Sequence, residues 1–433
     1  GFKNTPRLFG MDQNWASPGW PFILGDQDPN IRFKAAENGW LVSDRESANL
    51  TTNFSQSRIE DLSFKGTLEP FREFKVQLDM RKNKTAQYKE IFRFDTTKFD
   101  MGDPSPYSSL TPNRFGTYSI SFLAIGTSFV RDRDDNSSEV FDTFLTNLDV
   151  IRQRLNQVNP VAEYNNESQD VMIPAFLAAY AKRDVNTIAL SPFPGTPIPN
   201  WRVDYSGLGK MEGLREVFSN VTVSHAYSSN YTVQKYTSSQ QYSETSLRNR
   251  VEDYPLATEV NENGDLIPVY VINQVVMGER FSPLIGISVR TQTRMNITME
   301  YKRERNLALN LSNTQITELN SKDVSLTFGY TKPSFKLPFR VQGRQVVLDN
   351  DLTFRLNFTI RDTKTTQRKL TNIHTVTNGN INFQFNPQVQ YVLNQRLDVT
   401  LYFERNINTP RISNSFPRST TAFGIRVNFS LAQ

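Results

Sequence analysis

Apolar and polar side chains alternate along much of the chain, and the alternation is clearest after position 280. In residues 352–360 the apolar side chains that fall on one side of an extended backbone include Phe354, Leu356, Phe358 and Ile360. Polar side chains fall on the other side, namely Arg355, Asn357, Thr359 and, next in sequence, Arg361. A period of two residues is typical of a β-strand with one apolar and one polar face.

The same alternation recurs elsewhere and predicts a series of strands. It is present in seven further segments: 74–81, 295–302, 306–312, 324–331, 381–386, 397–404 and 423–431. Less regular segments that also fit a strand are 118–125, 217–227, 231–236 and 284–290. Short polar connectors separate neighbouring segments; Tyr391–Arg396 is typical of a tight hairpin, and residues 377–380 carry an Asn-Gly turn signal. This order favours an antiparallel meander.

A different pattern interrupts the predicted strands between about residues 130 and 215. Apolar side chains at helical spacing predict an amphipathic helix over residues 138–157, and a second helix over residues 168–182. Four prolines in residues 192–201 then predict an extended link that disfavours both helix and central strand. We expect an insertion between strands. Two interpretations fit it: a docking platform for partners, or helices that pack together or cap the mouth of a barrel.

Strand length helps to choose between all-β architectures. Strands of soluble proteins usually have about five or six residues, whereas strands that cross a membrane need about 9–11. The run 352–360 has nine residues of strict alternation. The sequence therefore favours an all-β fold, an antiparallel transmembrane β-barrel with a small helical insertion. A soluble β-sandwich or β-propeller is the alternative.

Composition narrows the chemistry further. The 433 residues include 31 Phe and 16 Tyr but no Cys, which excludes disulfides, cysteine nucleophiles, iron–sulfur clusters and thiolate zinc sites. The net charge of +5 is spread along the chain, so nucleic acid is not expected as a partner. Mean hydropathy is −0.51, and no stretch approaches the roughly 18 consecutive apolar residues of a membrane helix. Any membrane crossing must therefore use strands.

Catalytic motifs are not found in the sequence. His225 and His374 lie in strand-like contexts without a local partner motif, and there is no nucleophile elbow, zinc-binding helix or phosphate-binding glycine loop. The run Asp132–Asn136 places carboxylates at alternate positions, as in a calcium loop, but lacks the glycine and glutamate that such a loop needs. We interpret this run as a solvated turn. We therefore expect no catalytic residue, no cofactor and no metal site.

The alternating strands supply the candidate functional residues. Side chains expected to face lipid are Phe354, Leu356, Phe358 and Ile360. Side chains expected to line an aqueous lumen are Arg355, Asn357, Thr359, Arg361, Asn382 and Gln384. A polar wall suits a conduit, because apolar patches would trap cargo by burial at about 25 cal/mol per Å². A final alternating strand is interpreted as a barrel-assembly signal, carried by Phe423, Ile425, Val427, Phe429 and Leu431.

Several longer runs carry a resemblance to a known family. They lie between residue 18 and residue 330 and are Pro18–Gly25, Ile31–Trp40, Ile173–Tyr180, Ile198–Tyr205, Leu214–Tyr227, Phe281–Ile287 and Leu307–Leu319. These runs resemble the C-terminal part of the SprA/Sov family, whose members are outer-membrane translocons of the type IX secretion system in Bacteroidota and are required for gliding motility in some of these bacteria. Beyond residue 330 only the generic strand pattern continues.

The resemblance implies a function and a set of partners. It implies a C-terminal portion of a giant single-chain barrel in the outer membrane of a Gram-negative bacterium, exporting folded cargo proteins. The implied partners are a PorV-like shuttle barrel, a plug, other secretion-system subunits and cargo with C-terminal signal domains, besides outer-membrane lipid. The alternative is a nutrient-uptake barrel of the TonB-dependent or porin type, which shares alternating strands. A third reading is a soluble extracellular β-protein that binds glycans.

The expected organisation follows the two patterns along the chain. It comprises a leading segment or loop at 1–50, barrel strands at 51–129, the helical and Pro-rich insertion outside the membrane at 130–215, and barrel strands at 216–433. The first thirty residues lack the features of a signal peptide, and we interpret the chain as a mature or truncated segment.

Overall fold

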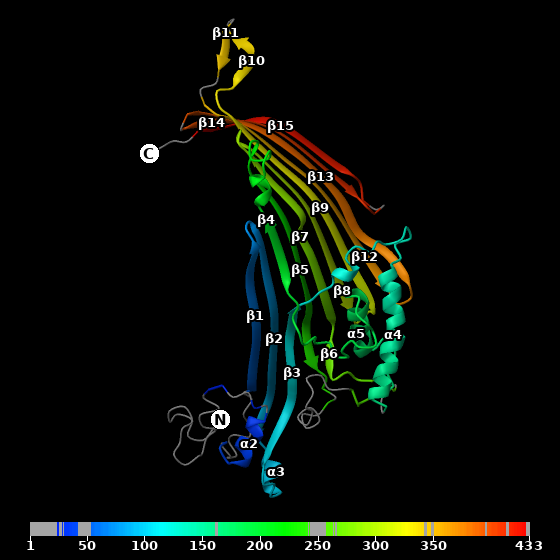
Figure 1. The fold of residues 1–433 in the computed structure, drawn as a ribbon. Helices are drawn as coiled ribbons and strands as arrows, with labels where there is room; N and C mark the ends of the chain where they lie inside the picture. The colour runs from blue at the N-terminus through cyan, green and yellow to red at the C-terminus, as the bar shows by residue number, and fades with distance from the viewer. Residues whose placement is uncertain are drawn as a thin grey trace.

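Most of the chain forms one tall, curved sheet of antiparallel strands, with two helices lying against one of its faces (Figure 1). The computed structural model describes residues 24–25, 28, 30–41, 53–160, 163–240, 242, 257–262, 264, 266–341, 344–347, 350–394, 396–412 and 415–429. The predicted all-β antiparallel fold with a small helical insertion is confirmed.

Thirteen strands form the main sheet, and consecutive strands are mostly neighbours. They are β1 (Phe54–Phe71), β2 (Phe74–Phe94), β3 (Tyr107–Ser121), β4 (Asn200–Tyr205), β5 (Phe218–Ser238), β6 (Tyr270–Ile272), β7 (Gln274–Thr291), β8 (Met295–Asn310), β9 (Gln315–Lys332), β12 (Leu352–Lys369), β13 (Ile373–Asn394), β14 (Leu397–Pro410) and β15 (Arg418–Phe429). A separate hairpin, β10 (Lys336–Val341) and β11 (Arg344–Val347), projects between β9 and β12 (Figure 1).

The strands are longer than the alternation in the sequence predicted. Strand β13 has 22 residues and β9 has 18, which at roughly 3.3 Å per residue is about 73 Å and 59 Å. The predicted segments 295–302 and 306–312 are one strand, β8, and the segments 217–227 and 231–236 are one strand, β5. The polar residues between these apolar runs, which the sequence predicts as turns, therefore lie within strands.

The Asn-Gly signal at residues 377–380 is one such error. These residues lie inside β13, where Thr365 of β12 faces Asn378 and the next residue, Thr366, faces Val376. Thr377 is therefore the extra residue of a β-bulge rather than part of a turn. The predicted hairpin at Tyr391–Arg396 is confirmed, because β13 ends at Asn394 and β14 begins at Leu397.

Strands β3 and β4 occupy a single strand position between β2 and β5. Ser121 of β3 faces Asn230 of β5, and Trp201 of β4 faces Tyr227, while the amide of Phe122 donates to the carbonyl of Ser229. Phe122 and Asn200 are thus successive positions of one interrupted strand, with the same register against β5 on both sides of the interruption. The insertion therefore leaves from within a strand and not, as the sequence suggested, between two strands.

The predicted boundaries of the insertion change accordingly. Residues 130–215 were assigned to it, but β4 at Asn200–Tyr205 belongs to the main sheet, so the Pro-rich link does lead into a central strand. The two predicted helices are confirmed as α4 (Glu139–Val158) and α5 (Gln169–Tyr180). A short 3₁₀ turn, η3 (Ile125–Thr127), precedes them.

Short helices lie at the ends of the strands. Helix α2 (Ile31–Glu37) falls in the predicted leading loop 1–50, and α3 (Thr96–Asp100) connects β2 to β3. The turn η4 (Gly207–Lys210) follows β4. Within the described parts of the chain, no helix is both long and apolar enough to span a membrane.

Candidate functional surface

The pairing register fixes which side chains share a face of the sheet. Phe358 lies opposite Leu326 of β9 and Phe385 of β13, so these apolar side chains point the same way. Thr359 lies opposite Gln384. Successive residues along a strand point to opposite faces of the sheet, so Thr359 and Gln384 lie on the face opposite to Phe358. The predicted lipid-facing set and the predicted lumen-facing set therefore lie on opposite faces. Which face meets lipid stays a prediction.

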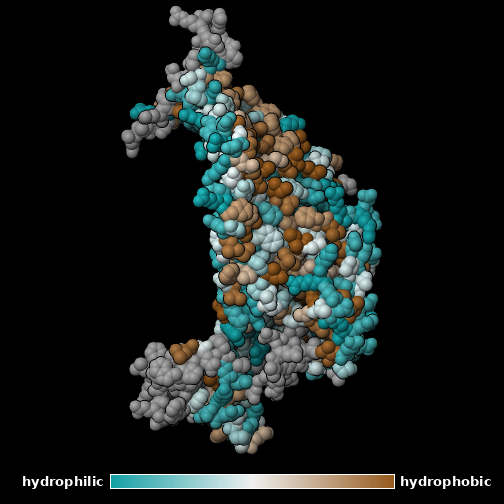
Figure 2. Space-filling view, viewed as in Figure 1, coloured by the Kyte–Doolittle hydropathy of each residue, from teal (hydrophilic) through white to brown (hydrophobic). Residues whose placement is uncertain are grey.

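One face carries a continuous apolar band across the upper halves of the strands, and we call it the apolar band. Figure 2 shows hydrophobic side chains gathered there, above the insertion. From β8 to β15 the band comprises Met295, Ile297, Met299 and Tyr301; Val324, Leu326, Phe328 and Tyr330; Phe354, Leu356, Phe358 and Ile360; Phe383, Phe385, Val389 and Tyr391; Val399, Leu401 and Phe403; and Phe423, Ile425, Val427 and Phe429. On β12 it covers seven residues, about 23 Å at roughly 3.3 Å per residue.

The opposite face of the same strands is polar and rich in amides, and we call it the polar face. Five successive positions of β13 on this face are amides: Asn382, Gln384, Asn386, Gln388 and Gln390. Charges on this face are in part neutralised across strands; the guanidinium of Arg361, for example, lies 2.7 Å from the carboxylate of Asp323. Arg355, Asn357 and Thr359 belong to the same face by register. This surface offers hydrogen bonds but little apolar area.

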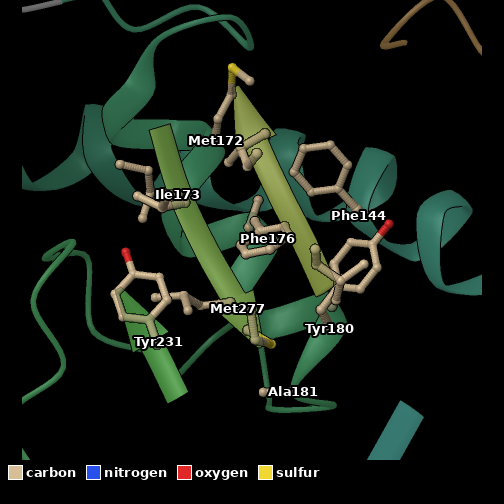
Figure 3. Packing of buried hydrophobic residues seen from close by; sticks show 14 of the residues in the cluster. Phe144, Met172, Ile173, Phe176, Tyr180, Ala181, Tyr231 and Met277 are labelled. Atoms are coloured by element: carbon tan, nitrogen blue, oxygen red, sulfur yellow. The ribbon is translucent and has the colours of Figure 1, made fainter. Parts of the chain in front are cut away.

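The helical insertion covers the lower part of the face that carries the apolar band. It buries a core between the helices and strands β3, β5, β7, β8 and β9 that includes Phe144, Ile151, Phe176, Tyr231, Met277, Leu307, Leu309 and Ile316. Figure 3 shows the α5 side chains lying among those of the strands and of α4. The insertion is therefore packed against the wall of the sheet, and its role as a docking platform for partners stays a prediction.

The two helices have different surfaces because they lie in different layers. Helix α4 is buried along one stripe, including Phe141, Phe144 and Leu148, and its other side is exposed. Every residue of α5 from Asp170 to Tyr180 is buried, as is typical of a helix enclosed on all sides. Burial raises the pKa of Tyr180 well above its ordinary value. The hydroxyl of Tyr180 is therefore neutral at any physiological pH.

A cluster of buried charges joins the start of the insertion to the sheet. The guanidinium of Arg368, which has no exposed side-chain surface, lies 2.6 Å from the carboxylate of Asp132 and 3.1 Å from that of Glu318. The ammonium of Lys364 lies 2.6 Å from the other oxygen of Asp132. The interpretation of 132–136 as a solvated turn is therefore wrong for Asp132, which is the link between the insertion and β12.

A second buried pair anchors the insertion a few residues earlier in the chain, at Thr127 and Ser128. The guanidinium of Arg305 lies 3.0 Å from the carboxylate of Glu279, and both side chains are almost completely buried. Arg305 also donates to the carbonyl and the hydroxyl oxygens of Thr127, at 3.1 Å and 2.9 Å. The hydroxyl of Ser128 donates to Glu279 at 2.6 Å. Each charge is thus paired and hydrogen-bonded, as burial requires.

These charges were missed in the sequence, although a signal for them exists. Glu318 points to the same face of its strand as Ile316 and Val324. Arg305 likewise points to the same face as Tyr301 and Leu307. Each is therefore a charge on the apolar side of an alternating strand. Such a charge is costly unless it is paired. Charges that break the alternation therefore mark where the insertion docks.

The two histidines make contacts with the surrounding structure. His225 Nδ1 lies 2.7 Å from the carbonyl oxygen of Leu284, and the ring of His374 packs edge-on against Phe141 of α4. Among the described residues there is no group of acidic or histidine side chains that could hold a metal ion.

The predicted assembly strand is β15, which pairs along its whole length with β14. Phe423, Ile425, Val427 and Phe429 share one face, and each is exposed by 59–69%. Leu431 lies outside the described residues. Strand β15 has no second neighbour within the described sheet, and β1 occupies the opposite edge.

Comparisons with known proteins add little to this picture. Neither a family model nor a curated protein matches the sequence. The solved structures that match include OmpT (in-vitro folded), an outer membrane protein of Vibrio cholerae, in its trimer form. It is 9% identical, with 87% of this chain and 99% of that chain covered and a TM-score of 0.20. A likeness at that TM-score carries no argument about this chain.

Proposed function

We propose that this chain forms part of the wall of a large outer-membrane β-barrel that conducts folded proteins across the membrane, as in type IX secretion. The observation that carries the membrane part is the apolar band, which extends about 23 Å along β12 at roughly 3.3 Å per residue. Outer-membrane barrels present an outward apolar band about 25 Å tall with strands tilted by about 35–45°, so the band on β12 is of the same order but shorter along the membrane normal. Strands β8, β9 and β12 are more than twice as long as this band, so their lower parts lie outside the hydrocarbon layer, and the insertion packs on this part of the sheet.

The two edges of the sheet support a wall segment of a larger barrel. Strands β1 and β15 each pair on one side only within the described sheet, although β15 has large apolar side chains such as Phe423. In lipid, unpaired backbone amides and carbonyls cost several kcal/mol each. Further strands must therefore complete both edges when the sheet is in a membrane.

The polar face supports the conducting part of the proposal. A pore for folded cargo needs a wetted surface that binds proteins weakly, and the amides of β13 provide hydrogen bonds that water satisfies equally well. The resemblance of the quoted runs to SprA/Sov proteins adds the secretion system, with a PorV-like shuttle, a plug and cargo as partners. Type IX export and gliding motility follow from that resemblance alone.

Location and transport are tested separately. Fractionation of cells should recover the protein with the outer membrane and release it only with detergent; recovery in a soluble fraction would exclude the barrel. Deletion of the gene should then leave cargo in the periplasm. Normal secretion with a loss of nutrient uptake would support the porin or TonB-dependent alternative instead.

A pair of variants tests the role of the polar face directly. Asn382→Leu combined with Gln384→Leu places apolar area on the conducting surface and should slow cargo export while leaving the barrel folded. Phe383→Leu changes the residue between them, which points to the other face, and should leave export unchanged. Equal export in both variants would contradict a conducting role for this face.

A further inference from the structure

The upper boundary of the insertion runs across the sheet directly below the apolar band. We call residues 124–132 the rim. Near one end the carbonyl oxygen of Thr127 accepts from Arg305 of β8, and at the other end Asp132 binds Lys364 and Arg368 of β12. Between these anchors the rim crosses β8 and β9, which lie between β7 and β12 in the sheet. The rim therefore has a fixed height on the wall.

The pairing register measures how close the rim is to the apolar band. The ring of Phe129 lies 5.3 Å from that of Phe281 and 5.0 Å from the guanidinium of Arg303. Phe281 and Arg303 face each other across β7 and β8, and the next residue on this face of β8 is Tyr301, the first of the apolar band. Phe129 thus lies one side-chain step below the band.

Exposed apolar groups and cations occur together on the rim. Phe129 is 51% exposed and Val130 is 39% exposed, although both belong to a segment that is otherwise anchored by buried contacts. Arg131 follows them, and Lys322 faces the same way as Arg303 on the adjacent strand. None of these three cations has a carboxylate partner within the described residues.

Two acids at this level, Asp132 and Asp362, are neutralised by cations. Asp132 binds two cations, and both carboxylate oxygens of Asp362 lie 2.7 Å from Arg411. The charge left over on the rim and the adjoining row is therefore positive. Aromatic and apolar side chains beside cations fit the boundary of a membrane, where rings lie at the level of the headgroups and cations meet phosphates.

We propose that the rim rests on the membrane surface, with Phe129 and Val130 in the interfacial layer and with Arg131, Arg303 and Lys322 binding the phosphate groups of anionic lipids. The insertion would then set the depth of the wall in the membrane, because its rim is joined rigidly to the strands. This inference rests on the proposed barrel function and adds a lipid partner to it.

Single spin labels test the depth of the rim. The chain contains no cysteine, so Phe129→Cys, Val158→Cys and Met299→Cys each give one labelling site in the full chain. The protein is reconstituted in nanodiscs of phosphatidylcholine and phosphatidylglycerol, and collision of the label with oxygen is compared with collision with a water-soluble nickel complex. Val158 is the control because it is 60% exposed at the C-terminal end of α4, and Met299 lies in the apolar band.

The three labels separate failure of this inference from failure of the barrel proposal. We expect the ratio of oxygen collisions to nickel collisions to be highest for the label at 299, lower for the label at 129, and lowest for the label at 158. A label at 129 that is as accessible to nickel as the label at 158, or shielded from both reagents by protein, would overturn the inference while 299 still reports lipid. Nickel access at 299 would overturn the membrane placement itself.

The lipid preference is tested with charge variants. Arg131→Gln and Lys322→Gln should each lower the association of phosphatidylglycerol relative to phosphatidylcholine by about fivefold, the effect of one basic side chain near an anionic surface. Arg355→Gln removes an exposed cation from the polar face and should leave the ratio unchanged. An unchanged ratio in Arg131→Gln and Lys322→Gln, or an equal fall in Arg355→Gln, would refute the phosphate site.

Discussion

Replacement of Asp132 by alanine tests whether buried charges hold the insertion on the sheet. The change removes two contacts of 2.6 Å, one to Arg368 and one to Lys364. Arg368 is fully buried and keeps Glu318, a backbone carbonyl and a ring nitrogen of His374, so with one carboxylate removed its charge is left partly uncompensated. Removal of one partner from a buried pair costs about 3–5 kcal/mol.

The magnitude falls at the lower end of that range. Asp132 is 14% exposed and Lys364 25% exposed, so water solvates part of what the substitution leaves behind. We therefore expect the docking of the insertion to weaken by about 3 kcal/mol, which is roughly 150-fold in the docking equilibrium. Asp149→Ala is the matched control, because its pair with Arg152 is 38% and 56% exposed and such pairs contribute about 0–1 kcal/mol.

Hydrogen exchange followed by mass spectrometry measures this effect in the reconstituted protein. In Asp132→Ala the amides of α4 and α5 should exchange faster, while those of β14, which the insertion does not touch, should be unchanged. In Asp149→Ala both regions should exchange as in the unaltered chain. Unchanged protection of α4 in Asp132→Ala would refute the reasoning, as would an equal acceleration in β14.

Four further predictions concern the faces, the core and the ends of the sheet. Phe358→Arg should lower the free energy of barrel folding by about 2–4 kcal/mol near the membrane midplane, whereas Arg355→Ala should be tolerated; equal defects in urea titrations of the two variants would contradict the assignment of faces. Burial raises the pKa of Tyr180, so docking should be fully retained below pH 10, the ordinary tyrosine pKa, and should weaken as pH rises above it; tyrosinate absorbance of Tyr180, taken as the difference from Tyr180→Phe, that appears in a still-docked insertion would contradict this. Deletion of residues 123–199 joins Phe122 to Asn200 in register and should preserve the strands but lose co-purifying partners; recovery of every partner would contradict an interaction role for the insertion. Removal of residues 423–433 should block membrane assembly, and normal amounts of inserted, protease-resistant barrel would refute the assembly signal.

The class of fold and the division of side chains between two faces follow from local patterns in the sequence. Phe358 and Thr359 point to opposite faces in any extended strand, because the backbone reverses the side-chain direction at each residue. The helices were equally readable, since the spacing of Phe141, Phe144 and Leu148 is a local property of the chain. Strand ends were not, and the bulge at Thr377 shows why: an Asn-Gly pair is compatible with a turn and with a bulge, and only the pairing partner decides.

The place of the insertion and the contacts that hold it depend on residues that are far apart in the sequence. The positions Phe122 and Asn200 are far apart in sequence, and only the register of β5 shows that they belong to one strand. Asp132 had the sequence of a solvated turn, and its burial depends on Lys364 and Arg368, which lie more than two hundred residues away. Local patterns reflect the geometry of the backbone, whereas the pairing of a buried charge depends on which distant strand carries the opposite charge at the same height of the sheet.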